Sequence, residues 1–468
     1  MIKEVVQQNE NGWKESKIQS EGGNEMKVQG KLLKLGLVLI LTASFLVMGG
    51  VAFSADPVKL TFWHHEAPSH RVMAFQKAID LFEKEHPNIK VKQEVVSWGD
   101  AWPKTLAAIR AGTTPDFEFD IPDFNLSMYM AGGLVPVDDM VKEIDEKYGY
   151  FKSSLGMYRH DGHYWGVPIW TMAFVWVYRP SYLQEYVGTT DPPKTWDQVA
   201  EYAKKMTVDK DGDGKIDIYG IGLTASKSLC TQEFIWSVMT TYGVRIYDEN
   251  GKVAFNTPET VKALKTYKEL WEYAAPAATG WIWGEIEMNF AGDKIAMMPY
   301  FPALQKRFYD AGNMDMEGAS LPVPPDGQHS TIIYPNAVMV FKSAEKRGVL
   351  DEVKAFVRFI MQPEINAILT AEQEPGGFLP VTEKAGASKA YWEDKYISAF
   401  KNMNEVAVDE VKNGTLYGFT HGKVVNKAIG DVIGANTLAE VVQRVIIEGE
   451  SPEKAAQWGH KKIEELSD

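Results

Sequence analysis

The stretch KLTFWHHE, Lys59 to Glu66, predicts where this chain places its binding chemistry. Leu60 and Phe62 alternate with polar neighbours, which is the two-residue period of a strand, and an uninterrupted polar and aromatic cluster follows. Ligands of α/β folds bind at the carboxyl ends of the sheet strands. We therefore predict ligand contacts from the residues of this cluster: Trp63, His64, His65 and Glu66.

The next segments predict a β-α-β unit. Residues 71–85 carry apolar side chains at spacings of three and four, which is typical of an amphipathic helix, and Pro87 ends it. Residues 89–96 return to the two-residue period, and FEFDIPD (117–123) predicts a third strand. If these strands are parallel, the residues that follow them share one rim of the sheet. Four further ligand contacts are predicted on this rim: Trp98, Asp100, Asp120 and Asp123.

Motifs along nearly the whole chain point to one family. After the strand KLTFW come, in order, FEKEHPNIKV, AAIRAGTTPDFEF, AGGLVPVDDM, YWGVPIWTMAFVWVYRPSYL, PPKTWDQVAEYAKKM, FAGDKIAMMPYFPAL and PGGFLPV. In these motifs and their order the chain resembles the extracellular (periplasmic) solute-binding proteins of ABC transporters, family 1, in the group that binds sugars and includes maltose-binding protein. The motifs are specific for the family but not for the ligand.

The resemblance implies an α/β, two-lobed periplasmic-binding-protein fold of type II, with a three-stranded hinge. The N-terminal lobe would comprise residues 56–169 and 337–380, and the C-terminal lobe residues 170–336 and 381–468. Ligand contacts are expected at the crossings and on an aromatic turn before the second crossing: Trp170, Thr171, Tyr300, Phe301, Tyr334, Asn336, Gly376 and Gly377. For Trp170 a place in the sheet core is an equal alternative. A tryptophan that maltose-binding relatives carry near Tyr300 is not matched, which leaves the sugar open.

The loop TGWIWGE holds two tryptophans, Trp281 and Trp283, that fit neither a helical nor a strand period. Loop tryptophans of this kind are candidates for stacking on a ligand. Pyranose rings pair an apolar face with a rim of hydroxyl groups, so sugar sites combine flat aromatic side chains with carboxylates and amides. We therefore predict that His64, Asp120 and Tyr300 line one common sugar-binding groove.

VDKDGDGKIDIYG places oxygen-bearing side chains two residues apart, with Gly214 at the sharp turn, as in a calcium loop. The twelfth position is Gly220 instead of the bidentate Glu. Two alternatives remain open, a structural calcium site or a charged turn without metal, and no cofactor is required. The ligands of the calcium alternative would be Asp209, Asp211, Asp213, Lys215 and Asp217.

The first 55 residues predict export. Residues 1–25 are polar and are either a wrongly assigned start or a non-native extension, whereas 26–55 have the basic start, apolar run and small-residue end of a signal peptide. An uncleaved anchor is the alternative; the small residues favour cleavage. The single cysteine, Cys230, permits no internal disulfide and offers no lipid-anchor position after the leader. We expect a periplasmic protein without a lipid anchor.

The formal charge of −14 and pI near 5.3 argue against nucleic acid as a partner. We predict a monomeric, non-enzymatic binding protein that captures a neutral mono- or oligosaccharide and delivers it to the permease subunits of an ABC importer. The nearest alternative is a binding protein for glycerol phosphate or another polyol derivative. A secreted glycoside hydrolase is the second, with Asp120/Asp123 or Glu285/Glu287 as its acid pair; no GxSxG, P-loop or HExxH motif is present.

Overall fold

A computed structural model describes residues 56–419 and 425–467. The predicted leader (1–25) and signal peptide (26–55) lie outside these residues, so both stay predictions. Within the described ranges, no helix combines the length and the apolar character that crossing a membrane requires.

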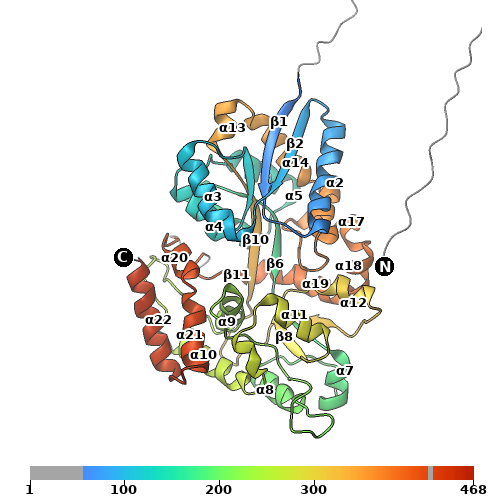
Figure 1. Cartoon of the computed structure of the whole chain (residues 1–468), viewed down its shortest axis with the longest axis vertical. Helices are drawn as coiled ribbons and strands as arrows, with labels where there is room; N and C mark the ends of the chain where they lie inside the picture. The colour runs from blue at the N-terminus through green and yellow to red at the C-terminus, as the bar shows by residue number, and fades with distance from the viewer. Residues whose placement is uncertain (1–55, 420–424, 468) are drawn as a thin grey trace, which may run out of the picture. The chain divides into compact units, whose positions relative to one another are not determined.

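A six-stranded sheet organises the first part of the fold (Figure 1). The predicted strands form, and β1 pairs in parallel with β2 and β3, so the carboxyl ends of all three share one edge. β10 joins this sheet antiparallel to β3 and is itself paired by β6 and β11. The strands are β1 (Val58–His64), β2 (Ile89–Val95), β3 (Phe117–Asp120), β6 (Val167–Ala173), β10 (Thr331–Val340) and β11 (Gly414–Thr415).

The first hydrophobic core lies between this sheet and its helices. The predicted amphipathic helix is α2 (Ser69–Glu85), which buries its apolar face, including Phe75 and Phe82. Phe62 of β1 stacks on Phe117 of β3 with ring centroids 4.7 Å apart. Phe356 of α14 (Leu350–Ile360) packs against both rings. The other helices of this region are α3 (Trp98–Ala111), α4 (Pro122–Met130), α5 (Asp138–Tyr148) and α15 (Pro363–Ala367).

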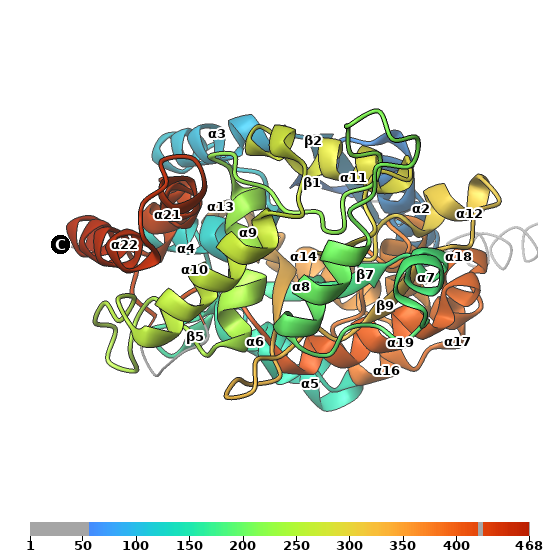
Figure 2. The same ribbon diagram turned by 90° about the horizontal axis from the view of Figure 1, so that it is seen from below.

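A second core surrounds a three-stranded antiparallel sheet of β7 (Val175–Tyr178), β8 (Met297–Tyr300) and β9 (Glu317–Ala319). Thr195 caps its helix as the sequence predicts, since its hydroxyl accepts a hydrogen bond from the Gln198 amide. Figure 2 shows α21 and α22 side by side next to α10. The main helices are α8 (Trp196–Lys205), α9 (Leu229–Thr241), α10 (Pro258–Trp271), α11 (Trp283–Ala291), α19 (Lys401–Glu410), α21 (Thr437–Ile446) and α22 (Pro452–Ser467).

Three segments run from one core to the other, in agreement with the three predicted crossings. β6 contributes Trp170 to the first core and Ala173 to the second, and β10 contributes Val338 and Ile333 in the same way. In the third segment, Leu379 exchanges backbone hydrogen bonds of 2.7 and 2.9 Å with Thr171 of β6. The predicted lobe boundaries and the hinge motion of these segments stay predictions.

One predicted strand end and one predicted loop are helix starts instead. Asp123 does not end a strand, because Pro122 takes the first position of α4, where its missing N–H costs no hydrogen bond. Trp283 is not in a loop but opens α11, whose Glu285 carboxylate accepts the Ile282 backbone N–H at 3.0 Å. Both changes move a polar or aromatic side chain to the first turn of a helix.

Candidate functional site

A cavity of about 440 Å³ is lined by residues from both cores. Nine residues predicted from the sequence line it together, although they come from strands, helix starts and crossing segments across more than 300 residues of chain. They are Glu66, Trp98, Asp123, Trp283, Tyr300, Phe301, Tyr334, Asn336 and Gly377. Tyr300 lines the cavity but His64 and Asp120 do not, so the prediction that these three residues share one groove is wrong.

Most side chains of the cluster at the end of β1 form hydrogen bonds inside the fold. The pairing of β1 with β2 continues to His64, whose Nε2 lies 2.9 Å from Gln93 Oε1, and burial lowers its pKa to about 4. His65 Nδ1 lies 2.9 Å from the Val96 carbonyl. The Trp63 indole donates to Glu94 at 3.0 Å. These three side chains do not line the cavity because each bonds to β2 or to the residue that follows it.

Three other predicted ligand contacts, Asp120, Trp170 and Thr171, are also buried in the fold and do not line the cavity. Asp120 is buried and accepts a 2.6 Å hydrogen bond from the Asn125 amide; burial raises its pKa well above the ordinary value. Trp170 lies in the sheet core, the alternative left open by the sequence, with Phe119 and Phe378 at centroid distances of 5.0 and 4.9 Å. Thr171 is buried in β6 and does not line the cavity.

The last three predicted residues outside the cavity are Asp100, Trp281 and Gly376. The Asp100 carboxylate accepts the Ser97 hydroxyl in the first turn of α3. Gly376 has a φ of 78°, and a Cβ there would lie 2.0 Å from Gln305 Nε2. Close packing against Gln305, in a left-handed backbone conformation, therefore explains the glycine without a ligand.

Aromatic side chains form the walls of the cavity. Trp98 and Trp102 project from the first turns of α3, their rings 6.1 Å apart, and Tyr300 and Phe301 follow from the end of β8. The sequence analysis missed the apolar lining residues Trp102, Ile121, Met172, Leu229, Ala303 and Phe378. Trp102 could have been found, because it lies one helical turn after Trp98.

Three carboxylates in the cavity are each held by an aromatic donor, and we name them the aromatic–carboxylate pairs. The Tyr334 hydroxyl donates to Asp123 Oδ1 at 3.1 Å, the Trp283 indole to Glu233 Oε2 at 2.9 Å, and the Tyr300 hydroxyl to Glu287 Oε1 at 2.6 Å.

Burial raises the pKa of each of these carboxyl groups. The pKa of Asp123 rises to about 6 and that of Glu233 to about 8, and the pKa of Glu287 also rises. Each carboxylate therefore loses solvation that a ligand donor could replace. Glu233 was missed in the sequence, although it is the one charged residue of the otherwise apolar and hydroxyl-rich α9.

Arg71 is the only basic side chain among the described residues that line the cavity. Its guanidinium donates to Glu66 at 2.6 Å and to Glu374 at 3.1 Å through Nε, and it lies 4.8 Å from the centre of the Phe378 ring. Burial opposes its charge, but the two carboxylates outweigh burial and raise its pKa. The cation is thus already engaged by protein carboxylates.

A wider opening of about 890 Å³ lies elsewhere, near Lys152, Arg159 and Phe419. Its lining includes Phe419 and Val425, which flank residues outside the described ranges. It also lacks the aromatic walls of the smaller cavity. We therefore take the smaller cavity as the candidate binding site.

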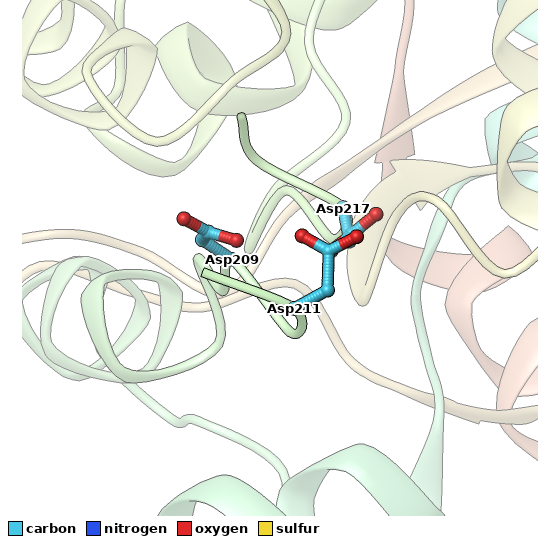
Figure 3. Close-up of side chains that lie close together, drawn as sticks. All are labelled: Asp209, Asp211 and Asp217. Carbon is cyan, nitrogen blue, oxygen red and sulfur yellow. The ribbon is translucent and has the colours of Figure 1, made fainter. Parts of the chain in front are cut away.

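The predicted calcium loop brings three of its five residues together (Figure 3). Ligand oxygens of Asp209, Asp211 and Asp217 lie within 4.8 Å of one another. Asp209 already accepts the amides of Gly212 and Gly214, at 2.8 and 2.9 Å. Asp213 instead pairs with Lys215 at 3.0 Å. Such bonds form in a charged turn without metal, so both alternatives stay open.

Neither acid pair of the hydrolase alternative faces the cavity as a pair. Asp123 lines the cavity, but Asp120 is buried beside Asn125. Glu287 lines it, but Glu285 is used at the start of α11. A glycosidase needs both carboxyl groups at the scissile bond, and these two pairs do not provide them.

Comparison with known proteins found relatives that are named as binding proteins. An Escherichia coli protein named "Putative ABC transporter periplasmic-binding protein YcjN" is 24% identical over 440 residues, covering 92% of this chain and 98% of that protein. A Brucella abortus protein named "Putative binding protein" is 26% identical over 353 residues, covering 75% of this chain and 82% of that protein.

Solved structures agree on the fold. The cyclic alpha-maltosyl-1,6-maltose binding protein of Arthrobacter globiformis superimposes with a TM-score of 0.71 at 18% identity, covering 88% of this chain and 99% of that one. Residues 69–367, more than half of the chain, match the family described as bacterial extracellular solute-binding protein. The chain belongs to this family of bacterial extracellular solute-binding proteins, whose members bind solutes and are not enzymes.

Proposed function

We propose that the protein is the substrate-binding component of an ABC importer and captures a mono- or oligosaccharide without negative charge in the cavity between its two cores. The observation that carries the proposal is the set of three aromatic–carboxylate pairs in one cavity of about 440 Å³. Carboxylates accept hydroxyl protons, and the aromatic rings pack on the apolar face of a pyranose. The size is in the usual range of small-molecule sites, roughly 300–1,000 Å³.

The same cavity argues against the phosphate alternative. A glycerol phosphate needs a cation or a cluster of backbone amides, and Arg71 is already bonded to Glu66 and Glu374. Adding an anion beside five lining carboxyl groups would cost free energy through like-charge repulsion. We therefore prefer a sugar or an uncharged polyol to its phosphate ester.

The transport role also follows from family membership. The three segments that connect the cores would allow the cavity to close on its ligand while each core stays intact. The closed form would be the one that the permease subunits recognise. We further propose that the mature protein is periplasmic after signal-peptide cleavage, acts as a monomer, binds no nucleic acid and catalyses no reaction.

A thermal-shift screen against neutral sugars, sugar acids and glycerol phosphates tests the proposal. A ligand at a hundredfold excess over its Kd should stabilise the protein by about 2.7 kcal/mol, because it binds only the folded state. Stabilisation by a neutral sugar, lost in a Glu233→Gln/Glu287→Gln double variant, is the expected result. Stabilisation by glycerol phosphate alone, or turnover of a glycoside, would contradict the proposal.

A further inference from the structure

Among the described residues, the cavity contains more carboxyl groups than the protein itself pairs with cations. Five acidic side chains line it, and Arg71 pairs with two of them, Glu66 and Glu374. Asp123, Glu233 and Glu287 have no Lys, Arg or His partner within ion-pair distance among the described residues. Their side-chain donors are the neutral groups of the aromatic–carboxylate pairs, and Asp123 also accepts backbone N–H groups in the first turn of α4.

The surroundings of Glu233 have the same character. The Trp283 indole holds one of its carboxylate oxygens, and no second protein donor reaches this side chain in the described ranges. The described titratable groups that interact electrostatically with Glu233 carry no positive charge. They are the carboxyl group of Asp123, the thiol of Cys230 and the phenols of Tyr300, Tyr334 and Tyr417. Among the described residues, no Lys, Arg or His pairs with Glu233.

We infer that the ligand is a basic carbohydrate, a sugar that carries one protonated amine, and that its ammonium group lies beside Glu233 and Asp123. This inference rests on the proposed function and narrows its ligand class from sugars without negative charge to amino sugars. The ammonium group supplies the cation that the cavity lacks, and the ring keeps the aromatic contacts that any sugar would make.

The energetics favour the amine over a hydroxyl at the same position. With the cavity empty, burial holds the pKa of Asp123 and Glu233 at about 6 and about 8, so ionising both carboxyl groups costs free energy. A hydroxyl donor relieves little of this cost. An ammonium relieves it by charge as well as by hydrogen bonding, which should give about tenfold tighter binding.

Matched sugar series provide the test. Isothermal titration would compare glucose, glucosamine and N-acetylglucosamine, the corresponding galactose series, and the disaccharides cellobiose, chitosan dimer and diacetylchitobiose. The N-acetyl members keep the nitrogen but remove its charge. We expect the free amine to bind about tenfold tighter than both partners of its series. Repeating the titration in buffers of different ionisation enthalpy should show proton release with the amine only.

Variants assign the preference to the cavity. Glu233→Gln keeps the shape of the side chain but removes one of the two carboxylates proposed to bind the ammonium group. We expect it to reduce the amine preference to about threefold or less. Glu201→Gln is the matched control, an exposed acid on α8 that pairs with Lys205 and lies outside the cavity. This control should leave the preference unchanged.

The outcomes separate the two proposals. Equal binding of amine and neutral members would overturn the inference and leave the proposed function standing. Binding of 1,4-diaminobutane as tight as that of the amino sugar would overturn the inference, because the sugar ring would then contribute nothing. If no sugar of any series bound, the proposed function would fail and the inference with it.

Discussion

Two groups of carboxylates in this chain have different surroundings in the structure. The loop group, Asp209, Asp211 and Asp217, lies in an exposed or half-exposed turn, where backbone amides satisfy the side chains locally. The cavity group, Asp123, Glu233 and Glu287, is mostly buried, comes from three different helices and is bonded by aromatic donors.

Burial, rather than the number of acidic residues, decides how much free energy a carboxylate gains when a ligand bonds to it. A solvated carboxylate gains little from a new donor, because water already supplies one. A buried carboxylate with a single neutral donor lacks solvation that a ligand can restore. The compact loop group therefore carries less functional information than the dispersed cavity group.

The largest expected effect comes from removing an aromatic donor. Trp283→Ala takes away both the Glu233 hydrogen bond and an aromatic wall, so we expect the Kd of the best sugar ligand to rise about 100-fold. Trp281→Ala is the control, two residues away and outside the cavity, and should change the Kd less than about threefold. Titration calorimetry measures both. Equal losses of affinity in the two variants would contradict the distinction between Trp283, which lines the cavity, and Trp281, which does not.

The next largest effect is expected in the pH dependence of the free energy of unfolding. A carboxyl group whose pKa is raised on folding stabilises the protein fully below its unfolded pKa, and this contribution is lost as pH rises through the folded pKa. For Glu233 the window runs from 4.5 to about 8. Relative to Glu233→Gln, the wild-type free energy of unfolding should fall by on the order of 3 kcal/mol between pH 5 and 9.

Denaturant unfolding at several pH values checks this expectation. Asp123→Asn should remove a weaker dependence at lower pH, because the pKa of Asp123 moves from 3.8 only to about 6. A constant difference between wild type and Glu233→Gln across the whole range would show that Glu233 is better solvated than its position implies.

Ion pairs offer the same contrast between buried and exposed charge on a single helix. Arg71 and Lys77 both project from α2 and pair with Glu374 and Glu372, but the Lys77 pair is far more exposed. Arg71→Met should destabilise the protein by about 2 kcal/mol, because it leaves Glu66 and Glu374 without their cation. Lys77→Met should cost less than about 0.5 kcal/mol. Urea unfolding at neutral pH measures both, and similar losses would contradict the prediction.

The fold could be predicted from the sequence because its signals are local. The two-residue period of β1 and β2 and the amphipathic face of α2 depend on neighbouring residues only, and the structure confirms all three elements. The rim was also correctly placed, since parallel strands end at one edge. Asp123 and Trp283 were misassigned because the residue types at a helix start also occur at strand ends and in loops.

The site could be predicted only in part, because the sequence does not show which way a side chain points. His64 and Asp120 sit at strand ends as expected, yet both are buried inside the fold, where they bond to Gln93 and Asn125. Glu233 stands out as the one charged residue of α9, but the sequence does not show that it faces a cavity. Its partner Trp283 is 50 residues away, and only the folded chain brings the two together.

The smallest effects are expected in the loop group. Asp211→Asn should change the free energy of unfolding by less than about 0.5 kcal/mol and leave sugar binding unchanged, because its carboxylate is exposed and accepts only the Asp213 amide. Without the twelfth-position Glu, calcium should shift the Tm by less than about 1 °C. A shift of several degrees that Asp209→Asn abolishes would instead establish a structural calcium site. The loop acids would then resemble the cavity acids in depending on a bound partner, a cation in place of a sugar.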